Sequence, residues 1–202
     1  MPTRAEIKRE AKQAFHQSYG IALGGFLLYA IITGAVSSMT FGFGFLLSLP
    51  LMVGLTYFFN TLSRFEKPEI GDLFAGFSRY GRNLGALLWM ELWIFLWSLL
   101  FVIPGIIKTL AYSMTPYILA DCPNVSATDA LKLSMRMTQG RKGQIFVFYL
   151  SFIGWYLLSM LTFGLLAIFY VGPYQMTAAS ALYYEIKRDA IIEGRVDATE
   201  LA

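Results

Sequence analysis

The chain has 202 residues, of which 56% are hydrophobic and 14% are charged. Soluble domains carry roughly 25% charged residues, so this chain has too few charges to cover a water-facing surface and an ordinary soluble domain is excluded. The net charge of +3 is too small to indicate nucleic-acid binding, and the single cysteine, Cys122, excludes an intramolecular disulfide and a thiolate metal cluster.

The N-terminal segment, residues 1–20, has the pattern of an amphipathic helix. It mixes basic and acidic residues and is followed by no small-residue cleavage site, so we do not expect a cleaved signal peptide. Thr3 and Glu6 have the spacing of a capping box. One face of the helix would carry Ile7, Ala11, Ala14, Phe15 and Ser18.

Six apolar runs follow, and about 20 apolar residues suffice to span a bilayer as a helix. We therefore expect an all-α, polytopic membrane protein forming one integral membrane domain over residues 1–202. The sequence Pro104-Gly105 is expected to divide the long run 84–120. The fourth run is the shortest and most polar, so a re-entrant or tilted segment is an alternative there. The predicted spans are 21–37, 41–59, 84–103, 106–120, 145–163 and 165–184.

Fifteen of the sixteen Lys and Arg residues fall in four segments, 1–20, 60–83, 121–143 and 185–202, and Lys108 is the exception. The other connections, near 38–41, 104–105 and 163–164, are short and uncharged. Basic residues in short loops stay on the cytoplasmic side of a membrane. This distribution predicts six spans with both termini and both long loops in the cytoplasm.

A threefold internal repeat underlies the six runs. Amphipathic stretches at 4–18, 69–80 and 127–139 each precede an outgoing span, and glycines recur at the junctions. We interpret this as three hairpins, each preceded by a cytoplasmic amphipathic helix, although three independent solutions to one physical problem would look similar. The paired glycines would let helices approach closely. They are Gly20 and Gly24, Gly81 and Gly85, and more loosely Gly140 and Gly143.

Amphipathic helices of this kind bury an apolar face at the interface and present basic residues to anionic lipid. The expected partners are therefore membrane lipids, above all the anionic head groups of the inner leaflet, and we expect no nucleic acid. The candidate head-group contacts are Lys8, Arg9, Lys12, Arg79, Arg82, Lys132, Arg136, Arg141 and Lys142.

A candidate polar site lies within the predicted spans. Glu91 is an acid inside the third run, and intramembrane carboxylates are costly enough to suggest function. Trp89, Trp93 and Trp97 recur every four residues, and Glu91 lies about 200° around the helix from Trp89. Glu91 would therefore face the bundle interior, as a functional group or as a structural acid bonded to a neighbouring helix. Residues that could share its site are Ser98, Lys108, Thr109, Tyr112 and Ser113.

Lys108 is not expected to pair with Glu91. If the chain turns at Pro104-Gly105, the two residues are separated on the order of 15 Å along the helix axis. Lys108 would instead extend its amine toward the outer face. The hydroxyls of the fourth run could line a wet cavity, or they could be ordinary contacts between membrane helices.

Several short segments are distinctive together: Pro104-Gly105-Ile106-Ile107-Lys108, Ala111-Tyr112-Ser113-Met114, Pro116-Tyr117-Ile118-Leu119-Ala120-Asp121, Ser134, Gly140 with Lys142, Ser151-Phe152-Ile153-Gly154-Trp155, Gly164 and Pro173-Tyr174. With these segments the chain resembles the bacterial integral membrane family called "domain of unknown function 975". The resemblance implies a small multi-span protein of the bacterial cell membrane and assigns no reaction, substrate or catalytic residue.

No catalytic or cofactor motif is recognisable. His16 and Cys122 are single residues at distant positions, which makes a metal or nucleophile site improbable, and we expect no cofactor. The sequence favours a non-enzymatic protein acting through lipid or membrane-protein contacts, in an envelope-homeostasis or immunity-type role. The alternatives are a small transporter or channel subunit that uses Glu91 and the polar fourth span, and an assembly subunit or homo-oligomer.

Overall fold

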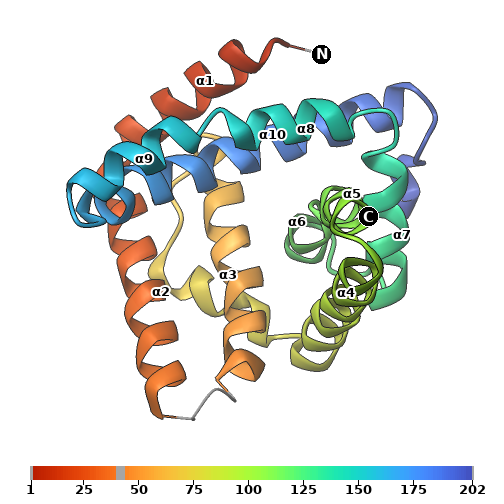
Figure 1. Cartoon of the computed structure of the whole chain (residues 1–202), viewed down its shortest axis with the longest axis horizontal. Helices are drawn as coiled ribbons and strands as arrows, with labels where there is room; N and C mark the ends of the chain where they lie inside the picture. The colour runs from red at the N-terminus through yellow and green to blue at the C-terminus, as the bar shows by residue number, and fades with distance from the viewer. Residues whose placement is uncertain (1, 40–43, 202) are drawn as a thin grey trace.

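The computed structural model describes residues 2–39 and 44–201, and these residues form helices and loops without a strand (Figure 1). The all-α prediction is confirmed. In chain order the elements are α1 (Arg4–Gln17), α2 (Tyr19–Met39), α3 (Phe45–Ser63), the 3-10 helix η1 (Ile70–Phe77), α4 (Tyr80–Leu100), α5 (Val102–Tyr112), α6 (Thr115–Asp121), α7 (Ala127–Met137), α8 (Lys142–Leu150), α9 (Ile153–Leu161), the π-helical η2 (Ala167–Val171), α10 (Gly172–Ile192) and the 3-10 helix η3 (Ala198–Leu201).

Four helical stretches of the described chain are long and apolar enough to cross a membrane: Tyr19–Met39, Leu46–Ser63, Tyr80–Leu100 and Lys142–Leu161. They correspond to the first, second, third and fifth predicted spans. The predicted turn near 38–41 and the beginning of the predicted span 41–59 lie partly outside the described residues.

The other two predicted spans are not single apolar helices. The run 106–120 is divided between α5 and α6, each too short to cross alone, with the break at Ser113 and Met114. The run 165–184 begins in η2 and continues into α10, which extends to Ile192 through charged residues. Hydropathy alone did not separate these segments from spans because the residues buried inside a protein are as apolar as those facing lipid.

The junction between α4 and α5 differs from the expected turn at Pro104-Gly105. Phe101 has extended backbone angles, φ −160° and ψ 147°, and it ends α4 and caps α5. Pro104 lies in the first turn of α5, where the missing N–H of proline removes no helical hydrogen bond. A Cβ on Gly105 would lie 2.2 Å from Ser98 Oγ, so this glycine permits close packing of α5 on α4 and does not form the turn.

Three groups of helices extend in different directions from a shared centre (Figure 1). They are α2 with α3, α4 with α5, and α8 and α9 with α10. In this view α2 and α3 run downward, α4 is seen nearly end on, and α9 extends to the left. The side chains of α8 and α9 meet α10, through ring contact of Phe152 with Tyr174 and a hydrogen bond between Tyr156 and Gln175. The three groups are splayed, in contrast to a bundle of parallel spans.

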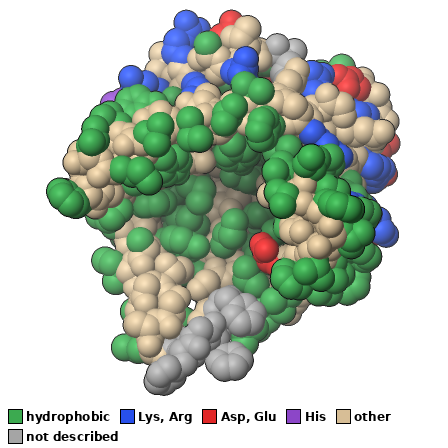
Figure 2. Space-filling view, in the orientation of Figure 1, with side chains coloured by type: hydrophobic (Ala, Val, Ile, Leu, Met, Phe, Trp, Pro, Cys, Tyr) green, Lys and Arg blue, Asp and Glu red, His purple; other side chains and the backbone are tan. Residues whose placement is uncertain are grey.

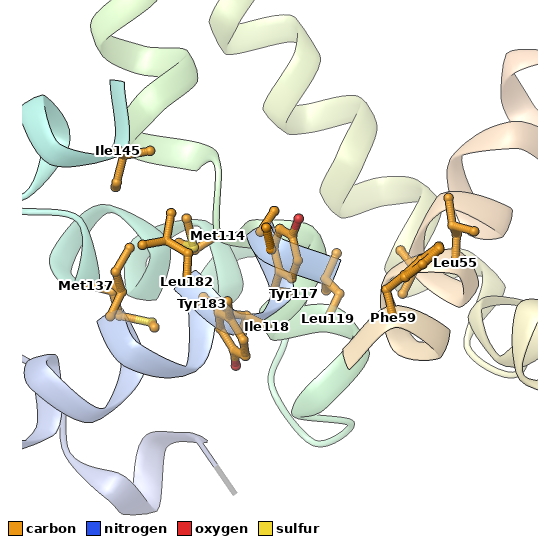
Figure 3. Packing of buried hydrophobic residues seen from close by; sticks show 14 of the residues in the cluster. Leu55, Phe59, Met114, Tyr117, Ile118, Leu119, Met137, Ile145, Leu182 and Tyr183 are labelled. Carbon is orange, nitrogen blue, oxygen red and sulfur yellow. The ribbon is translucent and has the colours of Figure 1, made fainter. Parts of the chain in front are cut away.

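The centre is built around α6, whose residues Thr115–Leu119 are all buried. Figure 3 shows Tyr117 of α6 beside Tyr183 of α10, and Phe59 of α3 beyond Leu119. The rings of Tyr117 and Tyr183 stack with centroids 5.5 Å apart. We call α6 and the facing residues of α3, α7 and α10 the hub.

Ser134 of α7 stabilises the break between α5 and α6. Its hydroxyl accepts a hydrogen bond from Met114 N–H at 3.2 Å and donates one to the Ala111 carbonyl at 2.8 Å. A helix break inside apolar surroundings leaves backbone groups that need partners. Ser134 provides them, so the interruption of the fourth run is a packed feature of the fold.

Helices form at each of the three predicted amphipathic stretches. The capping box of Thr3 and Glu6 is present in α1, and the apolar face of this helix, including Ile7 and Phe15, is buried. Phe15 contacts Tyr174 of α10, so this face covers protein.

The predicted role of the paired glycines is wrong. Apart from the adjoining backbone of its own segment, no described atom lies within 4 Å of a Cβ built on Gly20, Gly24, Gly81, Gly85, Gly140 or Gly143. Close approach occurs instead between α3 and η1, where a Cβ on Gly54 would lie 1.9 Å from the Leu73 carbonyl oxygen and one on Gly76 1.9 Å from that of Pro50. Glycine spacing along the chain did not reveal which glycines meet a neighbouring backbone.

Candidate functional site

A cavity of about 640 Å³ lies between the three groups of helices. Figure 2 shows a central hollow surrounded by hydrophobic side chains, with Lys and Arg along the upper and right edges of the molecule. The lining residues come from α2 to α6 and α8 to α10: Phe26, Tyr29, Met52, Thr56, Met90, Glu91, Ile94, Thr109, Leu110, Tyr112, Ser113, Pro116, Tyr117, Tyr149, Tyr156, Gly172, Gln175, Met176 and Ala179. We call this space the central cavity.

Four of the six predicted polar-site residues line the central cavity: Glu91, Thr109, Tyr112 and Ser113. Ser98 does not line it, because Ser98 packs against Gly105 and donates to the Ile94 carbonyl at 2.7 Å. The structure therefore places residues from both sides of the predicted site, one on α4 and one on α5, at one cavity.

Lys108 lies outside the cavity lining. Its amine lies 5.2 Å from the ring centroid of Trp97 and 5.5 Å from that of Tyr112. In the described part of the chain Lys108 forms no ion pair with Glu91. Aromatic faces attract a cation, so these two rings stabilise the amine.

The threonine and serine hydroxyls on the cavity wall donate to backbone carbonyls of their own helices. Thr109 donates to the Gly105 carbonyl, Ser113 to that of Leu110 and Thr56 to that of Met52. Gln175 accepts a hydrogen bond from Tyr156. The wall is consequently more apolar than its residue types suggest.

Glu91 is the exception on this wall. No hydrogen bond or ion pair joins its carboxyl group to another residue in the described ranges. The rings of Trp89 and Trp93, 5.8 Å apart, are partly exposed on the other side of α4. Glu91 is an exposed residue on the cavity wall. Inside a membrane its carboxyl group would need a ligand donor, water or a bound proton.

The aromatic contribution of the remaining helices was missed in the sequence. Tyr29, Tyr117, Tyr149 and Tyr156 line the same cavity from α2, α6, α8 and α9. Tyrosines are common both at membrane interfaces and in packed cores. Their number was visible in the sequence, but their convergence on one space was not.

Five of the nine predicted head-group contacts have partners within the protein. Lys8 donates to Ser151 Oγ at 2.7 Å and lies 3.8 Å from the ring centroid of Phe152. Lys132 pairs with Asp129 at 3.1 Å, and Arg136 pairs with Glu200. Arg141 pairs with Asp189 at 3.3 Å and with Glu193, and this guanidinium lowers the pKa of the Glu193 carboxyl through a hydrogen bond.

Arg82 is the fifth, and it is a structural residue. Its guanidinium donates to Asn83 Oδ1 and to the carbonyl oxygens of Leu119, Cys122, Pro123 and Val125. These carbonyls lie at the C-terminal end of α6 and just beyond it, where a helix has no intrahelical donors. Arg82 therefore joins the beginning of α4 to the end of α6, and its donors are not available to a head group.

The remaining four basic residues are available. Arg9, Lys12, Arg79 and Lys142 form no hydrogen bond or ion pair with other described residues. Arg9 and Lys12 are exposed on α1, and Arg79 is exposed immediately before α4. These four are the basic side chains through which contact with an anion is most direct.

The single cysteine and histidine take no part in the central cavity. Cys122 is buried at the end of α6, and burial raises the pKa of its thiol, which keeps it protonated at neutral pH. The ring of His16 packs near Phe15 and Tyr170. Within the described residues, no group of three His, Cys, Asp or Glu side chains is arranged to hold a metal ion.

Residues 99–190 match a family model described as "Protein of unknown function (DUF975)". The matched region begins at the end of α4. It includes the α6, α7 and α10 parts of the hub, without α3, and the α5, α6 and α8–α10 walls of the central cavity. No curated protein and no solved structure matches the chain significantly.

Proposed function

Since this chain belongs to the DUF975 family of proteins of unknown function, we propose its role from its own geometry: it is a membrane protein that binds a lipid in the central cavity. The observation that carries the proposal is an apolar, aromatic cavity between splayed helices, with a single unpartnered carboxyl group, Glu91, on its wall. Binding sites for small molecules are typically clefts of about 300–1,000 Å³ with mainly apolar walls and a few polar groups.

The exposed surface supports a membrane setting. Leu99, Leu100 and Phe101 at the junction of α4 and α5 are each more than three-fifths exposed, and Phe163 beyond α9 is almost fully exposed. Large exposed apolar areas are rare in soluble monomers and are typical of membrane contact. We propose that the projecting helices enter the bilayer of a bacterial cell while the basic face stays at the cytoplasmic surface.

In this arrangement both termini are cytoplasmic and the chain is multi-pass. Six crossings require α5 with α6, and η2 with α10, to act as bent or partial spans. A reporter fused to the C-terminus tests the orientation. We expect activity from a cytoplasmic reporter alone, and activity of an external reporter would contradict it.

The central cavity suits an acyl chain better than an aqueous path. Most of its wall is apolar, and the hydroxyls of Thr109 and Ser113 donate to backbone carbonyls. An acyl chain gains from removal of apolar surface from water and from contact with closely packed aromatic rings. A hydroxyl or amine near the lipid head could donate to Glu91, which provides the polar specificity.

We propose a non-enzymatic role in which lipid contact itself is the activity, of an envelope-homeostasis or immunity type. A second membrane protein, or another copy of this chain, is a possible partner through the exposed apolar faces of α2 and α4. Lipid retention is the property to measure first.

Filling the central cavity tests lipid binding. Ile94→Trp adds an indole on the cavity wall, and Leu96→Trp adds the same group to an exposed position of α4 outside the lining. In native mass spectrometry of protein extracted from membranes, wild type and Leu96→Trp should retain a bound lipid and Ile94→Trp should lose it. Equal lipid retention by Ile94→Trp and Leu96→Trp would overturn the proposal.

A transporter or channel subunit is the second candidate, favoured by the unpartnered carboxyl of Glu91. In reconstituted vesicles with a pH-sensitive dye, this candidate predicts proton flux that Glu91→Gln abolishes and Glu10→Gln, on exposed α1, leaves intact. Flux unchanged by Glu91→Gln would remove it.

A further inference from the structure

A second, polar pocket of about 390 Å³ lies at the basic end of α3 and α4. It is separate from the central cavity: Val53 and Tyr57 of α3 line this pocket, while Met52 and Thr56 line the central cavity. A water molecule occupies about 30 Å³ in the liquid, so this pocket has room for a group the size of a lipid head. We call it the arginine pocket.

Three guanidinium groups and one carboxylate line the arginine pocket: Arg64, Arg79, Arg82 and Asp121. The carboxylate of Asp121 is already engaged, because it accepts hydrogen bonds from Tyr183 at 3.0 Å, Tyr184 at 3.1 Å and Lys187 at 2.5 Å. It also pairs with Arg64 at 4.0 Å. One carboxylate thus faces three guanidinium groups, and the pocket keeps an excess of positive charge.

The three arginines differ in what remains available. Arg82 is bonded to backbone carbonyls, and Arg64 pairs with Glu66 at 3.2 Å. Arg79 has neither a hydrogen bond nor an ion pair with a described residue. A planar guanidinium matches the oxygens of a phosphate group, so Arg79 is the free donor of the pocket.

Asn60 provides an independent observation. Its side chain lines the pocket and is 2% exposed, and neither its amide nitrogen nor its amide oxygen has a hydrogen-bond partner among the described residues. Buried polar atoms are nearly always paired, and an exception needs an explanation such as a bound molecule. The amide of Asn60 can donate to a phosphate oxygen and accept from a head-group hydroxyl.

The beginning of α4 also favours an anion in this pocket. Arg79 occupies the N-cap position, and no side chain caps this 21-residue helix. The first N–H groups of an uncapped helix and its dipole both favour an anion. Free guanidinium, buried amide and helix N-terminus thus converge on one pocket.

We infer that the arginine pocket binds a phosphate group, held by Arg79, Asn60 and the N-terminus of α4. The phosphate can belong to an anionic phospholipid head or to a free phosphate compound. The inference rests on the proposed lipid-binding function only if the phosphate belongs to a phospholipid. Under that source, the head group lies at the basic face, beside the projecting helices.

Binding to the full-length protein in an uncharged maltoside detergent tests this site. Glycerol phosphate and inorganic phosphate represent free phosphate, phosphatidylglycerol represents the lipid, and diacylglycerol is the lipid without phosphate. Calorimetric titration measures the soluble compounds, and native mass spectrometry measures the retained lipid.

Arg79→Gln should weaken binding of the phosphate compound about tenfold, the effect of losing one charge-assisted hydrogen bond. Arg4→Gln is the matched control because it removes the same charge from an exposed, unpaired position of α1 that is not among the predicted head-group contacts. It should leave binding within about twofold, since an exposed charge outside the pocket acts only through screened, long-range attraction.

Asn60→Leu separates binding from folding. An apolar side chain of similar shape removes two buried, unpartnered polar atoms, so the variant should unfold at the same or a higher temperature without ligand. The same variant should lose phosphate affinity. A residue with a merely structural role would lower thermal stability when replaced.

Each result of these binding measurements either supports or excludes phosphate binding in the arginine pocket. Binding of glycerol phosphate or of phosphatidylglycerol that is sensitive to Arg79→Gln and Asn60→Leu supports the pocket and identifies the source. No phosphate binding, or equal binding by Arg79→Gln and Arg4→Gln, overturns it. Ile94→Trp should leave glycerol phosphate binding unchanged, so failure of the central cavity and failure of the arginine pocket are distinguishable.

Discussion

The hub and the projecting junction of α4 with α5 have similar apolar compositions but opposite surroundings. Within α4 alone, Leu87 is 0% exposed against the hub, whereas Leu99 near the end of the helix is 73% exposed. In the hub, apolar side chains meet each other and polar groups such as Ser134 are paired. At the projecting junction little described protein covers the side chains, as the proposed contact with hydrocarbon requires. The hydropathy of a segment therefore does not show whether its apolar side chains pack against protein or project from it.

The same substitution at Leu87 and at Leu99 of α4 tests this difference between a buried and a projecting position. Leu87→Ala removes packed methyl groups and leaves a cavity, and it should lower the free energy of unfolding by about 4 kcal/mol. Leu99→Ala should change it by less than about 0.5 kcal/mol, because hydrocarbon surrounds this side chain in folded and unfolded states alike. Denaturant titration in detergent micelles measures both. Equal losses would show that the projecting junction is packed against protein.

Glycine substitutions make a similar comparison, between a packed and an open position of the backbone. Gly54→Ala would place a methyl group 1.9 Å from the Leu73 carbonyl and should destabilise the protein by about 3 kcal/mol, since backbone must move. Gly85→Ala, in open surroundings on α4, should stabilise it by roughly 0.5–1 kcal/mol through helix propensity. Thermal unfolding of the two variants gives the difference. A stable Gly54→Ala variant would mean that α3 and η1 do not touch.

The smallest expected effect concerns the two neighbouring arginines. Arg82→Gln leaves several carbonyls at the end of α6 without their donor and should cost about 2 kcal/mol. Arg79→Gln removes an exposed, unpaired guanidinium and should change stability by less than about 0.5 kcal/mol. The same thermal assay ranks them. The reverse order would indicate that Arg79 is structural and that the end of α6 does not need Arg82.

Much of the helical framework was predictable because its signals are local. The capping box at Thr3 depends on residues three apart, and the apolar face of α1 follows from helical periodicity. The division of the fourth run was not predictable, because what makes it stable is Ser134, twenty residues further along the chain. Likewise Pro104 was expected at a turn, but a proline is equally suited to the first turn of a helix.

The candidate site was predictable in part for the same reason. Glu91 and the hydroxyls of α5 were recognisable as polar residues in apolar runs, and the structure does bring Glu91, Thr109, Tyr112 and Ser113 to one cavity. Lys108 and Ser98 carry the same signal in sequence, yet they face Trp97 and Gly105 respectively. Which side of a short helix meets a cavity depends on how its neighbours cross.

The sequence by itself determined that this chain is helical, apolar and one-sided in its charge, because helix periodicity, run length and charge position are properties of neighbouring residues. Tertiary structure decided which apolar helices are buried and which project, which glycines allow close contact, and which arginines are free. The three arginines of the arginine pocket show the reason. Arg64, Arg79 and Arg82 look alike in the sequence, but only packing engages one with α6, pairs another with Glu66 and leaves Arg79 beside the unpartnered amide of Asn60.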